Sequence, residues 1–223
     1  MADENDIGSR ISASLQKGRV SQVRELVAQA ITEGRSAKDI LEHGLLDGMG
    51  VIGERFKNGD IYLPEVMIAA RAMAAGTELL RPLLTGENVR AAGRVCIGTV
   101  QGDKHDIGKN LVRMMMEGRG LEVIDLGVNV APEVFVRTAI EKKCQIIACS
   151  ALLTTTMPVM RRVVEACRQA GIRDTVRIMV GGAPLTQSYC DEIGADAYEP
   201  DAARAADRAL ELCRQSAASA PAC

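Results

Sequence analysis

The pattern that begins at residue 94 constrains the fold more than any other part of the sequence. From Arg94 onward, short apolar runs alternate five times with longer amphipathic segments. Apolar runs of this length are typical of strands in a parallel sheet that is covered on both faces. Five strand–helix units predict an α/β fold, with a five-stranded parallel sheet, helices on both faces and right-handed crossovers. The expected strands lie near 95–100, 121–126, 145–150, 176–180 and 197–198, and the expected helices near 107–118, 132–142, 157–170, 185–193 and 202–215.

The first 84 residues have a different pattern, in which apolar residues recur with the 3.6-residue period of helices. We expect a short helix near 7–15, a second near 20–31, a third that begins at Ser36 and a fourth that begins at Pro64. The third helix contains four glycines, each of which costs about 1 kcal/mol relative to alanine. Another helix or a ligand is therefore expected to lie close to it, within a bundle of four or five helices. These glycines are Gly44, Gly48, Gly50 and Gly53.

These patterns divide the chain into a helical domain at 1–84, a linker at 85–93, an α/β domain at 94–215 and a tail at 216–223. We expect a hinge at the linker. The net charge of −2 and the aromatic content of 2% argue against a nucleic-acid partner. No apolar run approaches the length of a membrane span and the acidic N-terminus is unlike a signal peptide, so we expect a cytoplasmic protein. The seven cysteines include no Cys-x-x-Cys pair, which argues against a zinc or iron–sulfur site.

One of the two histidines lies in the loop between the first predicted strand and the helix that follows, in the pattern Asp103-x-His105-x-x-Gly108. Such a loop lies at the carboxyl edge of a parallel sheet, where open α/β folds bind ligands. Neutral imidazole is a common metal ligand whose second nitrogen needs a partner, and Asp103 is close enough to be that partner. Gly108 removes a side chain where a bulky group could approach the backbone. A surface histidine, with Asp106 as the helix cap, is equally compatible with this short motif alone.

Two further loops, at 150–158 and 181–184, leave the same edge of the predicted sheet. Three consecutive threonines begin at Thr154, which is more hydroxyls than one helix cap needs, so the surplus can bond a ligand or the Asp103 carboxylate. The glycine pair that opens the second loop is either a tight turn or a groove without side chains that a flat ring system can enter. The other histidine, His43, has no Cys or His at ligand spacing, so we expect it to be structural or solvent-facing.

Together, Asp103-x-His105-x-x-Gly108, Ser150-x-Leu152 and Gly181-Gly182 resemble the three-part signature of cobalamin-binding domains that take the cofactor with its own base displaced. The helical half, from Gly44 through Phe56 to Pro64, is similar to the cap module of cobalamin-dependent methionine synthase. The whole chain resembles the free-standing corrinoid proteins of methyltransferase systems for methylamines, methanol or methoxyaromatics. This resemblance implies a helical bundle cap followed by a flavodoxin-like (Rossmann-like) α/β domain.

The resemblance also implies roles for individual residues. His105 is then the lower axial ligand of cobalt, Asp103 accepts the other imidazole proton, and Thr156 continues this relay. The displaced nucleotide tail enters near Gly108, Ser150 and the glycine pair. Phe56 and Leu63 shield the upper face of the corrin, although periodicity alone fits both equally well as ordinary bundle core. The remaining cofactor contacts expected from the motifs are Lys104, Asp106, Ile107, Leu152, Thr154, Gly181 and Gly182.

A corrinoid protein of this kind carries a methyl group on cobalt and does no substrate chemistry alone. The resemblance implies three partners: a substrate-specific methyltransferase, a second methyltransferase that methylates tetrahydrofolate or coenzyme M, and a reductive activase. The methyl donor is chosen by the partner and cannot be read from this chain. The alternatives are a cobalamin-binding subunit of an adenosylcobalamin-dependent mutase, a cobalamin-responsive regulator, and a receiver-like signalling domain without a cofactor.

Overall fold

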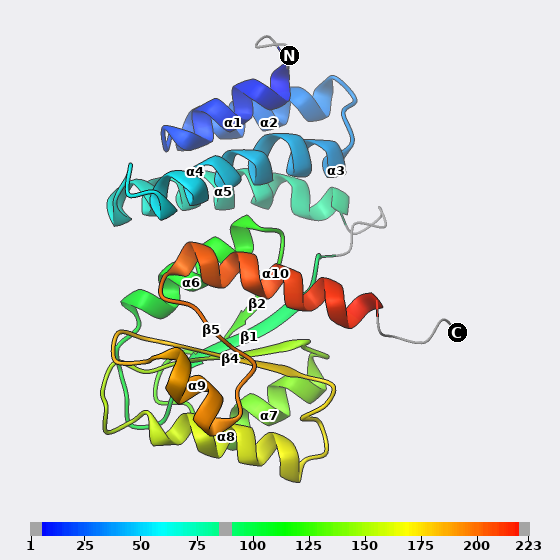
Figure 1. Cartoon of the computed structure of the whole chain (residues 1–223). Coiled ribbons are helices and arrows are strands. Elements are labelled where there is room, and N and C mark those ends of the chain that lie inside the picture. The colour runs from blue at the N-terminus through cyan, green and yellow to red at the C-terminus, as the bar shows by residue number, and fades with distance from the viewer. Residues whose placement is uncertain (1–5, 85–90, 219–223) are drawn as a thin grey trace. The chain divides into compact units, whose positions relative to one another are not determined.

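The computed structural model describes residues 6–84 and 91–218, and the chain divides into two compact units at residues 1–90 and 91–223 (Figure 1). Residues 85–90 of the predicted linker and residues 219–223 of the predicted tail lie outside the described residues. The last helix continues to Ala218, three residues beyond the end expected from the sequence. Among the described residues, no helix combines the length and the apolar character needed to cross a bilayer.

The first unit is built from helices that begin close to the predicted residues. Asp6 and Ser36 begin two of them, since their side chains accept hydrogen bonds from the backbone N–H groups of Gly8 and Asp39. The predicted third helix is three consecutive segments, because a π-helical stretch interrupts its α-helical pattern. The elements are α1 (Ile7–Gln16), α2 (Val20–Thr32), α3 (Ala37–Ile40), the π-helix η1 (Leu41–Leu46), α4 (Asp47–Lys57) and α5 (Leu63–Leu84).

Close packing explains two glycines of this unit. A Cβ atom on Gly44 would lie 3.0 Å from the Ile11 side chain, and one on Gly48 would lie 3.2 Å from the backbone of Ser12. Helix α1 therefore lies against η1 and α4, which confirms the expected close approach of a second helix. His43, on η1, is exposed and has its Nδ1 atom 3.6 Å from Asp47 Oδ2, so the prediction of a solvent-facing histidine is also confirmed.

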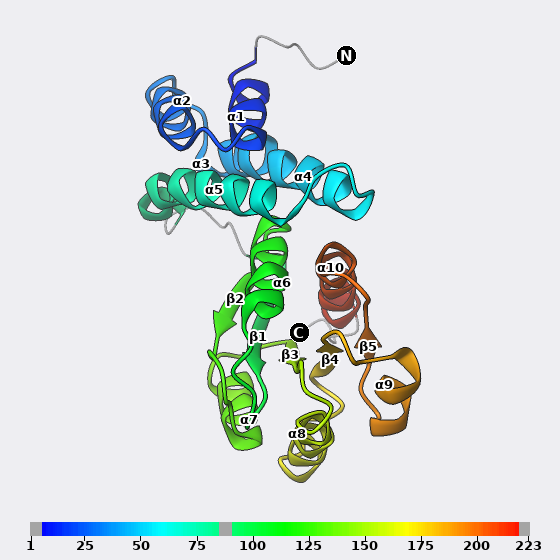
Figure 2. The same ribbon diagram turned by 90° about the vertical axis from the view of Figure 1, so that its left-hand side faces the viewer.

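The second unit is the predicted five-stranded sheet. All neighbouring strands are parallel, in the order β2-β1-β3-β4-β5, which confirms the flavodoxin-like fold. Helices α6 and α10 cover one face of the sheet, and α7 and α8 cover the other (Figure 2). The elements are β1 (Arg94–Thr99), α6 (Ile107–Gly118), β2 (Glu122–Asp125), α7 (Pro132–Glu141), β3 (Ile146–Ser150), α8 (Pro158–Gln169), β4 (Arg177–Gly181), α9 (Gln187–Ile193), β5 (Ala197–Tyr198) and α10 (Ala202–Ala218).

The strand register brings the predicted loops to one edge of the sheet. Thr99 pairs with Ser150, and Ser150 pairs with Gly181, so the chain leaves β1, β3 and β4 at the same level. An isolated bridge between Val100 and Val130 adds the loop between β2 and α7 to this edge. Four loops that are separate in the sequence therefore lie at one edge of the sheet, and the first of them contains His105.

Candidate functional site

His105 is held by a buried carboxylate. Asp103 is fully buried, and its Oδ1 atom lies 2.7 Å from His105 Nδ1 and accepts a hydrogen bond from the His105 backbone N–H at 3.0 Å. The His105 side chain is 52% exposed. With Nδ1 directed at Asp103, the tautomer and orientation of the ring are fixed, and Nε2 on the opposite edge is the atom that can ligate a metal.

The second Asp103 oxygen joins this loop to the one after β3. Oδ2 accepts hydrogen bonds from the backbone N–H groups of Leu152 at 2.8 Å and Leu153 at 3.1 Å. The Thr156 hydroxyl, which is buried, lies 3.0 Å from the same oxygen and 2.8 Å from the Leu153 carbonyl oxygen. The structure thus brings together Asp103, His105 and Thr156, the three residues of the predicted relay.

These contacts determine the charge of Asp103. Burial alone would raise the pKa of this carboxyl group, because it disfavours the charged form. The hydrogen bonds from the backbone and ring of His105 and from the backbones of Leu152 and Leu153 outweigh burial, and they hold the pKa well below its usual range. Asp103 is therefore an ionised acceptor beneath the imidazole.

The helix that follows the histidine loop is fixed by an ion pair that sequence reasoning missed. Lys109 is buried, and its Nζ atom lies 2.6 Å from Asp125 Oδ1 and 2.8 Å from Asn110 Oδ1. Asp125 ends β2 and also accepts a hydrogen bond from the Gly127 backbone N–H at 2.9 Å. The pair attaches the first turn of α6 to the end of β2. A lysine in a helix is usually solvent-facing, so the pattern gave no signal for it.

The other residues expected in this loop lie at the surface. Lys104, Asp106 and Ile107 are all exposed, and Ile107 is 72% exposed, which is unusual for a large apolar residue. Asp106 occupies the N-cap position of α6, but its side chain makes no capping hydrogen bond. It accepts a hydrogen bond from Asn110 Nδ2 at 3.0 Å instead, so Asp106 is the helix cap by position and through its backbone carbonyl, and its side chain takes no part in capping.

Ser150, Leu152 and Thr154 follow the end of β3. Ser150 is half-buried at the sheet edge, whereas the Leu152 and Thr154 side chains are exposed. The backbone N–H of Leu152 thus donates to the Asp103 carboxylate, while its apolar side chain lies exposed at the surface of the site. Phe56 and Leu63, in the helical unit, are both half-buried and lie outside its fully buried core.

Two glycines test whether a large cofactor fits this edge. A Cβ atom on Gly108 or on Gly181 would meet no atom of the described residues within 4 Å, and neither residue has a positive φ. Neither local packing nor backbone geometry thus requires glycine there. Both positions leave open surface that a side chain would fill, which fits a bulky group lying along the loops. Gly182 differs, because its φ is +140° and a Cβ atom there would collide with the Ala151 carbonyl oxygen. The fold itself therefore requires glycine at this position.

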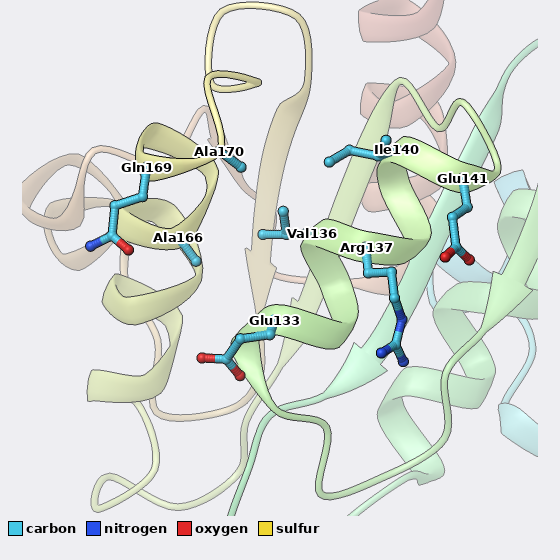
Figure 3. A pocket seen from close by; sticks show the side chains of 8 residues that line it. All are labelled: Glu133, Val136, Arg137, Ile140, Glu141, Ala166, Gln169 and Ala170. Atoms are coloured by element: carbon cyan, nitrogen blue, oxygen red, sulfur yellow. The ribbon is translucent and has the colours of Figure 1, made fainter.

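Two other observations delimit the site. No group of three or more His, Cys, Asp or Glu side chains that could hold a metal occurs in 6–84 or 91–218. A surface groove lies between α7 and α8 (Figure 3), but much of its lining comes from the C-terminal parts of these helices, whereas the histidine loop lies at the opposite, carboxyl edge of the strands. The lining residues are Glu133, Val136, Arg137, Ile140, Glu141, Ala166, Gln169 and Ala170.

Comparisons with known proteins find relatives for both units of the chain. The family model described as a B12 binding domain matches residues 93–207, and a second B12 binding domain model matches residues 8–81. Trimethylamine corrinoid protein 2 of Methanosarcina acetivorans is 40% identical over 210 residues, which cover 93% of this chain and 97% of that protein. Dimethylamine corrinoid protein 1 of the same organism is 42% identical over 193 residues, or 85% and 91% of the two chains.

Two solved structures extend the likeness to the fold. The methanol:cobalamin methyltransferase complex MtaBC from Methanosarcina barkeri contains a chain with a TM-score of 0.87 and 29% identity, over 95% of this chain and 81% of that one. The monomethylamine corrinoid protein of Methanosarcina barkeri gives a TM-score of 0.53 and 34% identity, over 94% and 100%. The resemblance inferred from the sequence is confirmed, and the chain belongs to the B12-binding corrinoid proteins.

Proposed function

We propose that this protein carries a methyl group on the cobalt of a bound corrinoid, from a substrate-specific methyltransferase to a second methyltransferase that methylates tetrahydrofolate or coenzyme M. The observation that carries the proposal is the half-exposed His105 ring, whose Nδ1 is fixed by the buried, ionised Asp103. The match of both units to B12 binding domains supports it, and so does the length shared with corrinoid proteins. The same matches favour a carrier over a mutase subunit, a regulator or a receiver-like domain.

The residues of the chain then have separate tasks. His105 would ligate cobalt through Nε2. Asp103 accepts the hydrogen bond from Nδ1–H and thereby makes Nε2 a more basic, stronger metal ligand. Thr156 keeps the Asp103 carboxylate in place. When bound, the corrinoid supplies a cobalt centre that accepts a methyl group and passes it on. The open positions Gly108 and Gly181, with Ser150 paired to Gly181, would accommodate the displaced nucleotide tail. The shielding roles of Phe56 and Leu63 stay predictions.

The partners follow from the chemistry and from the relatives. A methylated amine is the donor class that we favour, because the relatives with about 40% identity are named for trimethylamine and dimethylamine. The donor-specific methyltransferase, the acceptor methyltransferase and the reductive activase are the proposed partners, and the cytoplasmic location stays a prediction. Incubation of the reduced holoprotein with each methylamine and a matching methyltransferase should give the methylated cofactor. Methylation by none of these donors would contradict the assignment of donor class.

The decisive test of the cofactor site uses the small number of histidines. The chain contains only His43 and His105, so protein grown with ¹⁵N-histidine labels both positions and no other nitrogen that could ligate cobalt. In the electron paramagnetic resonance spectrum of the Co(II) form, the nitrogen splitting should change from a triplet to a doublet upon labelling. His105→Ala should lose this splitting.

His43→Ala is the matched control, because this histidine is exposed and paired only with Asp47 in the described structure. We expect it to keep the labelled doublet. A triplet that persists in labelled wild-type protein would show that the cofactor retains its own base, and the proposed function of His105 would then be wrong.

A further inference from the structure

Asn129 has an unusual backbone conformation in the loop between β2 and α7. Its φ is +56°, and among the described residues only one other non-glycine residue, Lys143, has a positive φ. Lys143 follows the end of α7, where left-handed residues commonly end a helix. Asn129 does not follow a helix, so its conformation needs a different explanation. Asparagine is one of the few residues that adopt this conformation at modest cost.

The explanation lies in its two hydrogen bonds, both of which are made to the histidine loop. Asn129 Oδ1 accepts a hydrogen bond from the Gly102 backbone N–H at 2.7 Å. The Asn129 backbone N–H donates to the Asp103 carbonyl oxygen at 2.9 Å. One residue thus satisfies polar backbone groups on Gly102 and Asp103, two consecutive residues that precede His105 in the loop.

Asn129 is itself fixed relative to the sheet. The next residue, Val130, donates its backbone N–H to the Thr99 carbonyl oxygen at 2.9 Å and forms a bridge with Val100. Thr99 is fully buried and donates its hydroxyl to the His105 carbonyl oxygen at 2.8 Å. The position of Asn129 is therefore set by the end of β1, the same strand that leads into the histidine loop.

Asp103 is consequently held from two sides. Its carboxylate is bound by the loop after β3, through Leu152, Leu153 and Thr156. Its backbone carbonyl is bound by the loop after β2, through Asn129. Asn129 thus adds a restraint on this backbone beyond the carboxylate contacts of Asp103 and the Thr99 hydroxyl bond to His105.

We infer that Asn129 is a positioning residue that sets how much of the bound cofactor has His105 on cobalt. This inference rests on the proposed function, since it needs His105 to be the ligand. Asn129 acts through Gly102 and Asp103, and its effect on cobalt is indirect.

The test compares two variants at one position. Asn129→Gly keeps the left-handed backbone and the N–H donor but removes the side-chain acceptor for Gly102. Asn129→Asp keeps an acceptor oxygen and tolerates the same conformation. The ratio of histidine-bound to histidine-free Co(II) protein, measured from the nitrogen splitting, should fall about fivefold in Asn129→Gly, the change expected for one ordinary hydrogen bond. In Asn129→Asp, this ratio should stay close to the wild-type value.

A second readout uses the protein without cofactor. Amide hydrogen exchange at Gly102 should become faster in Asn129→Gly, because this N–H loses its acceptor, and should return toward the wild-type rate in Asn129→Asp. Val128→Ala is the matched control, since Val128 is an exposed neighbour in the same loop. It should change neither the exchange rate nor the histidine-bound fraction.

The outcomes separate this inference from the proposed function. If wild-type protein lacks a histidine-derived splitting, the proposed function fails, whatever the variants do. If wild-type protein shows the splitting and Asn129→Gly keeps the same bound fraction, the inference is overturned and the proposed function stands. Faster exchange at Gly102 without any change in the bound fraction would overturn the inference as well.

Discussion

Gly182→Ala is expected to destabilise the α/β unit by about 4 kcal/mol, from left-handed backbone strain and overpacking together. The φ of Gly182 is +140°, a region that residues with a Cβ atom rarely adopt. A Cβ atom would lie 1.8 Å from the Ala151 carbonyl oxygen and 2.9 Å from its carbon. Both atoms belong to the backbone of Ala151, whose N–H donates to the Gly181 carbonyl oxygen at the end of β4, so neither can move aside cheaply. Urea denaturation followed by circular dichroism measures the effect.

Gly108→Ala and Gly181→Ala are the matched controls. A Cβ atom at either position meets no described atom within 4 Å, so we expect the free energy of unfolding to stay within about 1 kcal/mol of wild type. The same atoms would occupy the surface assigned to the cofactor tail, and corrinoid affinity should fall at least about tenfold. Wild-type corrinoid affinity in both controls would contradict the placement of the tail, and a stable Gly182→Ala protein would contradict the backbone argument.

Asp103→Asn is expected to cost about 3 kcal/mol of stability, because it leaves buried donors without an acceptor. Both Asp103 oxygens accept hydrogen bonds from N–H groups, Oδ1 from His105 and Oδ2 from Leu152 and Leu153. An asparagine side chain has one oxygen and one NH₂ group. Whichever way it points, the NH₂ group faces other donors. The variant should also lose most of the histidine-bound Co(II) signal, because the imidazole loses its anionic partner.

Asp106→Asn separates this effect from the loss of any carboxylate in the loop. Asp106 is exposed, and its carboxylate accepts a hydrogen bond from the Asn110 side chain at the surface. We expect the stability of this variant to stay within about 0.5 kcal/mol of wild type, as for most surface substitutions, and the nitrogen splitting to be unchanged. Equal losses in the two variants would indicate that loop charge, rather than the Asp103 contacts, holds His105.

Most of the architecture could be predicted, because hydrophobic period is a local property of the sequence. The switch from helical period to buried strands at Arg94 predicted the fold class, and all five strands start and end within two residues of the expected ranges. Period could not reveal the π-helix at Leu41–Leu46, since that helix is defined by i→i+5 hydrogen bonds between backbone groups, which have no residue signature. It could not show that the Asp106 carboxylate bonds the Asn110 side chain instead of a backbone N–H of α6, because both contacts use the same carboxylate.

The candidate site was predictable where side chains carry the chemistry. Asp103 and His105 are two residues apart, and the surplus threonines suggested a hydroxyl on Asp103, which is Thr156. The donors from Leu152 and Leu153 were hidden, because a backbone N–H has no residue signature. Asn129 was missed for a related reason: its role depends on a left-handed φ and on the Val100–Val130 bridge, and neither is a property of sequence pattern.

The strand order has a consequence for where any ligand of this unit must bind. From β1 the chain crosses to β2 on one side, and it later returns past β1 to β3 on the other. Adjacent strands β1 and β3 therefore send their following helices, α6 and α8, to opposite faces of the sheet (Figure 2). This arrangement is a topological switch point, which opens a crevice at the strand ends in every sheet of this order. His105, Asp103 and Thr156 lie in the loops that border it, so the location of the crevice is inherited from chain topology, and only its chemistry is chosen by the side chains.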